Sequence, residues 1–319
     1  MLLARRGHQV ALWARTEEEA RQLARDGENV KHRPGLRFPD SLVVTADVGA
    51  LAMARLVVFA VPAASLRANL ALVGPAIHRD AVVLSAIKGI LPEGGQRVSE
   101  VLSAAGFAME RLLVLSGPNF SSEIAAGLPA ATVVAGSDRR RTLWAQELLI
   151  GPTFRVYTSD GVVGVEIGGA LKNVVAIACG ISDGLGFGAN AKAALMTRAL
   201  AEVTRLGVAC GGRAITFLGL AGIGDLIASC ESNLSRNRRL GLALARGERL
   251  AEALKAIDGV VEGVDTTRAA RELSRRLGIE MPITEALHAV LFEGKDPRAL
   301  VADLMLRSAK EEFADLPAV

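Results

Sequence analysis

The sequence is poor in aromatic residues and cysteine, and its charge is nearly balanced. Only 4% of its 319 residues are aromatic, so its core must be built mainly from Ala, Val, Leu and Ile. The net charge is +3, without an extended basic stripe interleaved with aromatics. This argues against a nucleic-acid partner and fits a small anionic one. The three cysteines form no C-x-x-C pair and lie in apolar contexts, which predicts buried free thiols in a reducing compartment (Cys179, Cys210 and Cys230).

Long apolar runs and motifs of several enzyme classes are also lacking. No uninterrupted apolar run approaches the roughly 18 residues that span a bilayer. The opening MLLARRGHQVALWAR is broken by arginines and lacks a signal-peptide core, so we predict a cytoplasmic protein without a membrane span. No G-x-S-x-G segment follows a predicted strand, as a nucleophile elbow must, and there is no G-x-x-x-x-G-K-[ST] loop. The four histidines show no metal-ligand spacing, and we predict no metal site (His8, His32, His78 and His288).

The first half of the chain alternates short β-branched runs with helical stretches. A helix is predicted at Thr16–Arg25, where Thr16 and Glu19 have the spacing of a capping box. The apolar runs suit a sheet covered on both faces, and their alternation with helices predicts a doubly wound, mostly parallel α/β domain of Rossmann-like type. The predicted strands are His8–Trp13, Leu42–Thr45, Leu56–Val61, Ala81–Ala86, Leu112–Leu115, Ala131–Ala135 and Phe154–Tyr157.

The second half shows only helical patterns, which begin at about Val162 and are punctuated by glycine-rich turns, Pro282 and Pro297. We therefore expect an α/β domain over residues 1–158 and an all-α domain over residues 159–319.

A doubly wound dinucleotide domain normally opens with a strand, a G-x-G-x-x-G turn and a helix. This chain opens with Met1–Gly7, which is typical of the end of such a helix running into the second strand, so the first strand and its glycine turn are missing. Two internal glycine clusters, Gly184–Gly188 and Gly219–Gly224, follow no strand, and we interpret them as turns between helices.

Several long segments resemble the bacterial NAD(P)-dependent glycerol-3-phosphate dehydrogenase family. They include GVEIGGALKNVVAIACGISDGLGFGANAKAALMTRAL, GLAGIGDL, LSRNRRLGLALARG and MPITEALHAVLFEGKDPR, and the resemblance runs from Leu2 to about Arg307. Members of that family begin with the strand and glycine turn that this chain lacks. The resemblance implies reversible NAD(P)H-dependent reduction of dihydroxyacetone phosphate to sn-glycerol 3-phosphate, which supplies glycerophospholipid synthesis.

The resemblance makes Lys172 the catalytic residue and a substrate contact. A lysine can stabilise and protonate the oxyanion that hydride transfer to a ketone creates, and partial burial lowers a lysine pKa toward the working range. Lys172 lies among small residues, and a lysine extending from the end of a packed helix is the alternative without the resemblance. Asp225 matches the family's aspartate beside the lysine, although its Gly-Asp-Leu context also suits a helix N-cap.

The substrate phosphate is expected at Ser235, Arg236 and Asn237, where a capped helix start stands beside a guanidinium. A capped surface helix with solvated arginines is the alternative. Lys88 follows a predicted strand and corresponds to the lysine that the family uses where substrate and cofactor meet. Gly117 and Asn119 follow the next strand as further substrate contacts, with Asn119 in place of the family's commoner serine.

The cofactor contacts implied by the resemblance are Lys88, Ser121, Arg236, Val260 and Glu262, and Arg15 is a further predicted contact from its position. Ser121 replaces an alanine of the family. Arg15 follows the second predicted strand, where NAD-specific domains place an acidic residue. An arginine there suits the 2′-phosphate of NADP, so NADPH is the preferred cofactor over NADH. His32 is expected to border the adenosine site.

Two alternatives remain open: a related two-domain dehydrogenase of another small hydroxy acid, and an inactive truncated binding protein. Without the first strand and its pyrophosphate amides, residues 1–319 alone are expected to bind NADPH weakly. The substrate is expected to be a small phosphorylated molecule, and the protein a possible homodimer.

Overall fold

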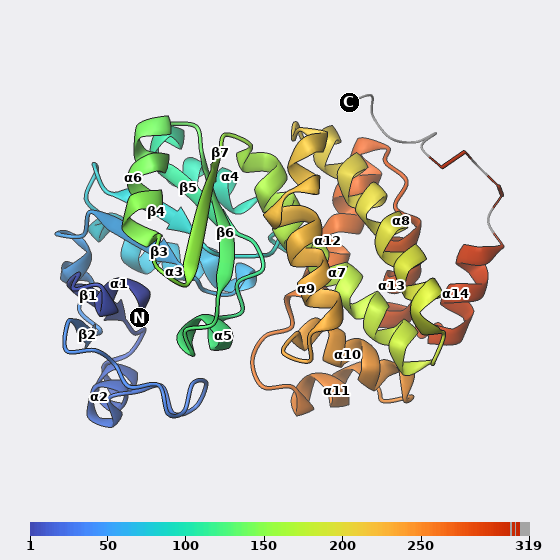
Figure 1. Ribbon diagram of the computed structural model, residues 1–319, viewed down its shortest axis with the longest axis horizontal. Helices are drawn as coiled ribbons and strands as arrows, with labels where there is room; N and C mark the ends of the chain where they lie inside the picture. Colours follow the sequence, from blue (N-terminus) through green and yellow to red (C-terminus); the bar gives the residue numbers. More distant parts are fainter. Residues whose placement is uncertain (307, 310, 313–319) are drawn as a thin grey trace.

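The computed structural model describes residues 1–306, 308, 309, 311 and 312, and it places the α/β half beside the helical half (Figure 1). The last residues of the predicted second domain, 313–319, lie outside the described residues. The strands are β1 Val10–Trp13, β2 Leu42–Thr45, β3 Leu56–Phe59, β4 Val82–Ser85, β5 Leu112–Ser116, β6 Ala130–Gly136 and β7 Phe154–Ser159. All predicted strands are therefore confirmed, and no end is shifted by more than two residues.

The first half carries the helices α1 Leu2–Arg5, α2 Glu17–Asp26, α3 Leu66–Val73, α4 Val98–Ala104, α5 Ser121–Ala125 and α6 Arg139–Leu149. The predicted helix at Thr16–Arg25 is α2, and the Thr16 hydroxyl accepts the backbone N–H of Glu19 as the capping spacing predicts. The chain opens as expected, with α1 leading directly into β1.

The strands form two hydrogen-bonded groups. β1 pairs with β2, and a second sheet has the order β3-β4-β5-β6-β7. All pairings are parallel except β5 with β6, which is antiparallel, so the prediction of a mostly parallel sheet is confirmed. β4 and β5 run in parallel, and the residues that follow both strands therefore meet at one edge of the sheet.

The second half consists of helices in the described residues: α7 Val162–Gly184, α8 Gly188–Ala209, α9 Asp225–Glu231, α10 Arg236–Ala245, α11 Leu250–Ala256, α12 Glu262–Leu277, α13 Pro282–Phe292 and α14 Pro297–Met305. Both glycine clusters lie between helices as predicted. The first joins α7 to α8, and the second forms a turn of π-helix that enters α9.

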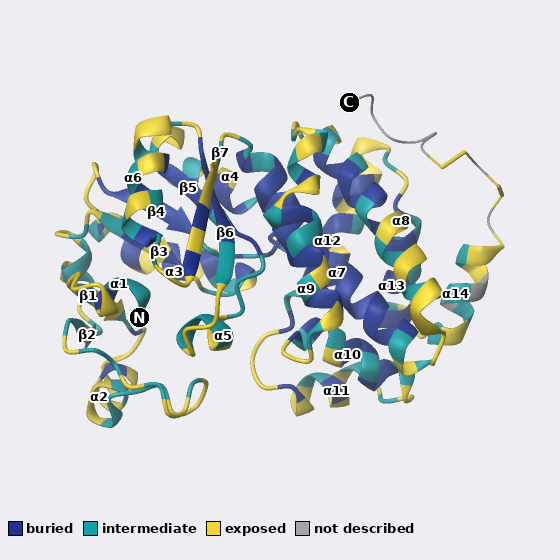
Figure 2. Cartoon of the chain, viewed as in Figure 1, coloured by how far each residue is buried: buried dark blue, intermediate teal, exposed yellow. Residues whose placement is uncertain are grey.

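Helix α7 is the centre of the helical half, where the buried surface is continuous (Figure 2). It is the one described helix that is long and apolar enough to cross a membrane, but 94% of its apolar window is buried inside the protein. It therefore has the character of a core helix. Lys172 lies in the middle of this helix and not at its end.

Glycine contacts let α10 approach α7 closely. A Cβ on Gly180 would lie 2.2 Å from the carbonyl oxygen of Arg238, and a Cβ on Gly241 would lie 2.1 Å from that of Ile177. Neither position has room for a side chain. This contact fixes the start of α10, with its three predicted phosphate-binding residues, relative to Lys172 on α7.

The free thiols depart partly from expectation. Cys179 and Cys230 are buried, but Cys210 is only partly buried. Cys210 follows the last residue of α8, where the helix ends near the surface.

Candidate active site

A cavity of about 1120 Å³ lies between the two halves of the chain. Its wall combines the loops after β3, β4 and β5 with α7, α9, α10 and the start of α12. The predicted site residues that line it are Lys88, Asn119, Ser121, Lys172, Asp225, Ser235, Arg236, Asn237, Val260 and Glu262. The predicted site residues at this cavity, from Lys88 to Glu262, thus lie up to 174 positions apart in the sequence.

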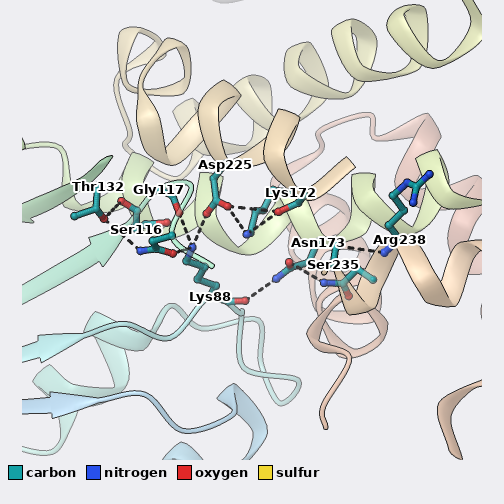
Figure 3. Close-up of polar contacts among 12 residues, drawn as sticks. Lys88, Ser116, Gly117, Thr132, Lys172, Asn173, Asp225, Ser235 and Arg238 are labelled. Carbon is teal, nitrogen blue, oxygen red and sulfur yellow. Dashed lines mark hydrogen bonds and ion pairs between the residues drawn. The ribbon is translucent and has the colours of Figure 1, made fainter. Parts of the chain in front are cut away.

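Lys172 is buried in the wall of this cavity and is held by two partners on α9 (Figure 3). Its ammonium donates to Asp225 Oδ1 at 2.5 Å and to Ser229 Oγ at 2.8 Å. The Lys172 side chain is 8% exposed. A lysine in such surroundings is desolvated but paired, which suits a proton donor whose position must be fixed.

Lys88 approaches the same carboxylate from the α/β half. Its ammonium donates to Asp225 Oδ2 at 2.7 Å, to the Gly117 carbonyl at 2.8 Å and to Asn119 Oδ1 at 2.5 Å. Burial lowers the pKa of Lys88 to about 8; Asp225 opposes this shift and Lys172 adds to it. Lys88 therefore titrates close to physiological pH.

Asp225 carries the negative charge between the two lysines. Burial by itself raises the pKa of its carboxyl, but the ammoniums of Lys172 and Lys88 prevail and hold that pKa below its ordinary value. The interpretation of Asp225 as a helix N-cap is wrong, because Gly224 occupies the cap and Asp225 is the first residue of α9. Its carboxylate oxygens are occupied by the lysines instead.

Glycines permit the close approach of the end of β5 to its neighbours, with Gly117 against β6 and Gly169 of α7 against β5. Gly117 has φ +139°, and a Cβ there would lie 3.0 Å from the Cα of Thr132. A Cβ on Gly169 would lie 2.4 Å from Ser116 Oγ. Gly117 does not line the cavity, but its carbonyl accepts a hydrogen bond from Lys88, which does. Substitution at either glycine would push the strand end away from the lysines.

A chain of side-chain amides joins the two halves beside the lysines. Asn173 donates to the backbone carbonyl of Lys88 at 2.9 Å and accepts from Asn237 at 2.9 Å. The Asn237 oxygen accepts the backbone N–H of Gly263 at 2.9 Å. The β4 loop, α7, α10 and α12 are thereby tied together by neutral hydrogen bonds.

The start of α10 has the predicted arrangement. Ser235 is the N-cap, and its hydroxyl accepts the backbone N–H of Arg238 at 3.3 Å. The Arg236 guanidinium donates to the carbonyl of Val260 at 2.7 Å. Ser235, Arg236 and Asn237 at this helix start all line the same cavity, a combination that suits an anionic phosphate.

Glu262 connects the helical half to the loop after β3. Its carboxylate accepts the backbone N–H of Ala63 at 3.0 Å and packs against Gly89. Burial raises the pKa of this carboxyl above its ordinary value, with Ala63 opposing the shift.

The remaining predicted cofactor residues lie at the other end of the cavity or outside it. Ser121 is the first residue of α5 and accepts from the guanidinium of Arg33. His32 lines the cavity and lies 3.4 Å from Asp258. Arg15 is exposed two residues after β1 and does not line the cavity.

Ser229 is the site residue that sequence analysis missed. It lies four positions after Asp225 on α9, so helical spacing places both side chains on one face. That spacing was the available signal, but a serine in a helix is too common to be singled out by it.

Family models match most of the chain. The NAD-dependent glycerol-3-phosphate dehydrogenase N-terminal model matches residues 1–142, and the C-terminal model of the same family matches residues 161–302. This chain belongs to the NAD-dependent glycerol-3-phosphate dehydrogenase family. The resemblance inferred from the sequence is thereby confirmed.

Individual relatives agree with this assignment. The chain is 48% identical to glycerol-3-phosphate dehydrogenase [NAD(P)+] of Moorella thermoacetica over 98% of this chain and 93% of the relative. Glycerol-3-phosphate dehydrogenase of Coxiella burnetii has the same fold, with a TM-score of 0.92 and 37% identity over 96% of this chain and 94% of that structure. The Saccharomyces cerevisiae enzyme aligns with a TM-score of 0.81 and 26% identity over 96% and 95% of the two chains.

Proposed function

We propose that this glycerol-3-phosphate dehydrogenase family member catalyses the reversible NAD(P)H-dependent reduction of dihydroxyacetone phosphate to sn-glycerol 3-phosphate. The observation that carries the proposal is the convergence of Lys88 and Lys172 on Asp225 inside the cavity between the two halves. Such a pair can neutralise and protonate an oxyanion formed at a ketone carbon. The family role of this product is to supply glycerophospholipid synthesis.

The residues present fit a phosphorylated ketone and a dinucleotide. The cavity of about 1120 Å³ exceeds the volume of typical small-ligand sites. The cationic side chains of Lys88, Lys172 and Arg236 line its wall and leave this volume open. When bound, the reduced nicotinamide supplies the hydride. Lys88, Ser121, Arg236, Val260 and Glu262 would hold this cofactor at the cavity wall.

The protein's own residues divide the remaining work. Lys172 donates a proton to the substrate oxygen, while Asp225 and Ser229 fix the position of its ammonium. Ser235, Arg236 and Asn237 hold the substrate phosphate at the start of α10. Lys88, oriented by Gly117 and Asn119, contributes positive charge where the substrate and the nicotinamide meet.

NADPH is proposed as the preferred reductant, with NADH as the weaker one. Support comes from the position of Arg15 after β1, where such domains recognise the 2′ substituent of the ribose, although its exposed guanidinium lies outside the cavity itself. We also propose residues 1–158 as the cofactor-binding part and residues 159–319 as the substrate-binding part. Site residues come from both sides of this boundary, since Lys88 follows β4 in the first part and Lys172 lies on α7 in the second.

Two further assignments extend the proposal. A cytoplasmic location is supported by the buried free thiols of Cys179 and Cys230. A homodimer is supported by exposed apolar side chains at Ile215 and Leu218, which are 58% and 64% exposed. Sedimentation velocity over a range of concentrations would detect the dimer, and a monomer at every concentration would contradict it.

The decisive experiment measures NADPH oxidation with dihydroxyacetone phosphate by the wild-type protein and by Lys172→Ala. Loss of a positioned general acid should lower kcat by about 10² to 10⁴. Lys255→Ala, which alters an exposed lysine on α11, is the matched control and should retain full turnover. Undiminished turnover in Lys172→Ala would rule out this lysine as the proton donor, and turnover of a non-phosphorylated hydroxy acid instead would favour the related dehydrogenase.

A further inference from the structure

The phosphate end of the cavity is formed by a short turn between α9 and α10. Asn233, Leu234 and Ser235 of this turn line the cavity and lead into Arg236 and Asn237. Within the turn, the backbone N–H of Leu234 donates to Ser232 Oγ at 3.1 Å, and that of Ser235 donates to the Ser232 carbonyl. These local bonds shape the turn but do not fix it to the rest of the protein.

A partly buried ionic cluster behind the turn provides that attachment. Asp183, near the end of α7, accepts from Arg238 Nε at 2.9 Å, and its oxygen lies 2.7 Å from the second guanidinium nitrogen. The same oxygen accepts from Lys192 of α8 at 3.0 Å. The Arg238 and Lys192 side chains are 14% and 11% exposed, and the Asp183 carboxylate is the anionic partner that the two cations share.

The two cations extend from Asp183 to both sides of the turn. Arg238 donates to Asn233 Oδ1 at 2.6 Å, inside the turn. Lys192 lies 2.9 Å from a carboxylate oxygen of Glu231, the last residue of α9. Burial tends to lower the pKa of Lys192, but Glu231 and Asp183 prevail and raise it, so this lysine stays charged.

Asp183, Lys192 and Arg238 do not line the cavity. The cluster therefore lies behind the substrate site and cannot touch a ligand there. It is also separate from the lysine pair, because Lys172 and Lys88 have Asp225 as their acidic partner.

We propose that Asp183 is a positioning residue for substrate binding: through Arg238 and Lys192 it fixes residues 231–235 and thereby the start of α10 that receives the substrate phosphate. The inference rests on the proposed function for the identity of the ligand. It predicts an effect on the binding of the phosphorylated substrate and little effect on the proton transfer by Lys172.

The test compares wild type with Asp183→Asn, which keeps the size of the side chain but removes its charge. Loss of the charge-assisted bonds should raise the KM for dihydroxyacetone phosphate roughly tenfold, with kcat changed by less than about threefold. The affinity for sn-glycerol 3-phosphate, measured by calorimetry on the full chain, should fall by a similar factor. Hydrogen exchange at residues 231–237 should accelerate, and Asp183→Glu should recover part of each effect.

The matched control is Glu285→Gln. Glu285 also pairs with two arginines, Arg271 and Arg275, but it lies on α13, joins that helix to α12 and does not line the cavity. The Glu285→Gln variant should leave the KM for dihydroxyacetone phosphate and the hydrogen exchange of residues 231–237 unchanged.

An Asp183→Asn protein with unchanged KM and unchanged exchange would overturn the inference. A lowered Tm accompanied by the same rise in KM in Asp183→Asn and in Glu285→Gln would also overturn it. If wild type neither turns over dihydroxyacetone phosphate nor binds sn-glycerol 3-phosphate, the proposed function fails. The exchange comparison then still decides whether Asp183 orders the turn.

Discussion

Lys88 and Lys172 donate to different oxygens of one carboxylate, although they come from different halves of the chain. Lys88 reaches Asp225 Oδ2 at 2.7 Å and Lys172 reaches Oδ1 at 2.5 Å. Two ammoniums thus share one anion, which leaves a net positive charge beside the cavity. An anionic substrate would complete the charge balance.

Removing that anion should destabilise the protein. Asp225→Asn leaves two buried ammoniums with only neutral partners, and loss of one member of a buried pair costs about 3–5 kcal/mol. We expect the free energy of unfolding to fall by about this amount at neutral pH. Denaturant titration at neutral pH and at about pH 10 would test this, because deprotonation of Lys88 should reduce the loss at high pH. An equal loss at both pH values would contradict the explanation.

The pKa of Lys88 predicts how stability depends on pH. This pKa is about 8 in the folded protein against an ordinary value of 10.5. Between these values the unfolded chain binds more protons, so the contribution of Lys88 to the free energy of unfolding rises with pH and is unfavourable below about pH 8. Lys88→Met should therefore weaken this rise, measured as the difference in unfolding free energy between about pH 7.5 and 10.5. A pH dependence identical to that of wild type would show that Lys88 does not titrate in this range.

The same titration should appear in substrate binding. Protonated Lys88 attracts an anionic substrate, so the KM for dihydroxyacetone phosphate should rise above about pH 8. Lys88→Arg keeps its charge at all accessible pH values and should remove this alkaline rise, whatever its effect on kcat. Initial-rate measurements from about pH 6.5 to 9.5 would decide, and a persisting rise in the arginine variant would assign it to another group.

Ser229 should matter more for turnover than for stability. Its hydroxyl accepts one bond from the Lys172 ammonium, at 2.8 Å. Ser229→Ala should lower kcat about tenfold, because one charge-assisted hydrogen bond is lost. Ser229→Thr retains the hydroxyl and serves as the control. Equal kcat in wild type and the alanine variant would show that Asp225 alone suffices to hold Lys172.

The crossing of α7 and α10 should tolerate no added methyl group. Gly180→Ala places a Cβ 2.2 Å from the Arg238 carbonyl oxygen, and overpacking of this kind costs about 1–3 kcal/mol. Gly151→Ala is the control, since no heavy atom lies within 4 Å of its added Cβ. The two variants should differ in Tm, and equal values would mean that the helices can shift apart without cost.

The sequence predicted the strands and the helical second half well, because apolar periodicity is a local property. It could not predict that β5 and β6 run antiparallel, since strand pairing depends on contacts distant along the chain. The division of the strands into two hydrogen-bonded groups was likewise not predicted.

For the candidate site, family resemblance predicted which residues gather, but not their contacts. Lys88 and Asp225 are 137 positions apart, and no local pattern reports a bond between them. The role of Ser229 and the lowered pKa of Lys88 emerge only when burial and neighbouring charges are known. For Arg15, by contrast, the sequence position predicts a cofactor contact, but its side chain lies outside the cavity.

The amides of Asn173 and Asn237 connect the two halves without any charge. Dissolved ions screen attraction between charged groups but hardly affect neutral hydrogen bonds. Raising the ionic strength should therefore slow the capture of an anionic substrate while leaving the alignment of the halves intact. The enzyme would lose affinity in concentrated salt and regain it fully on dilution.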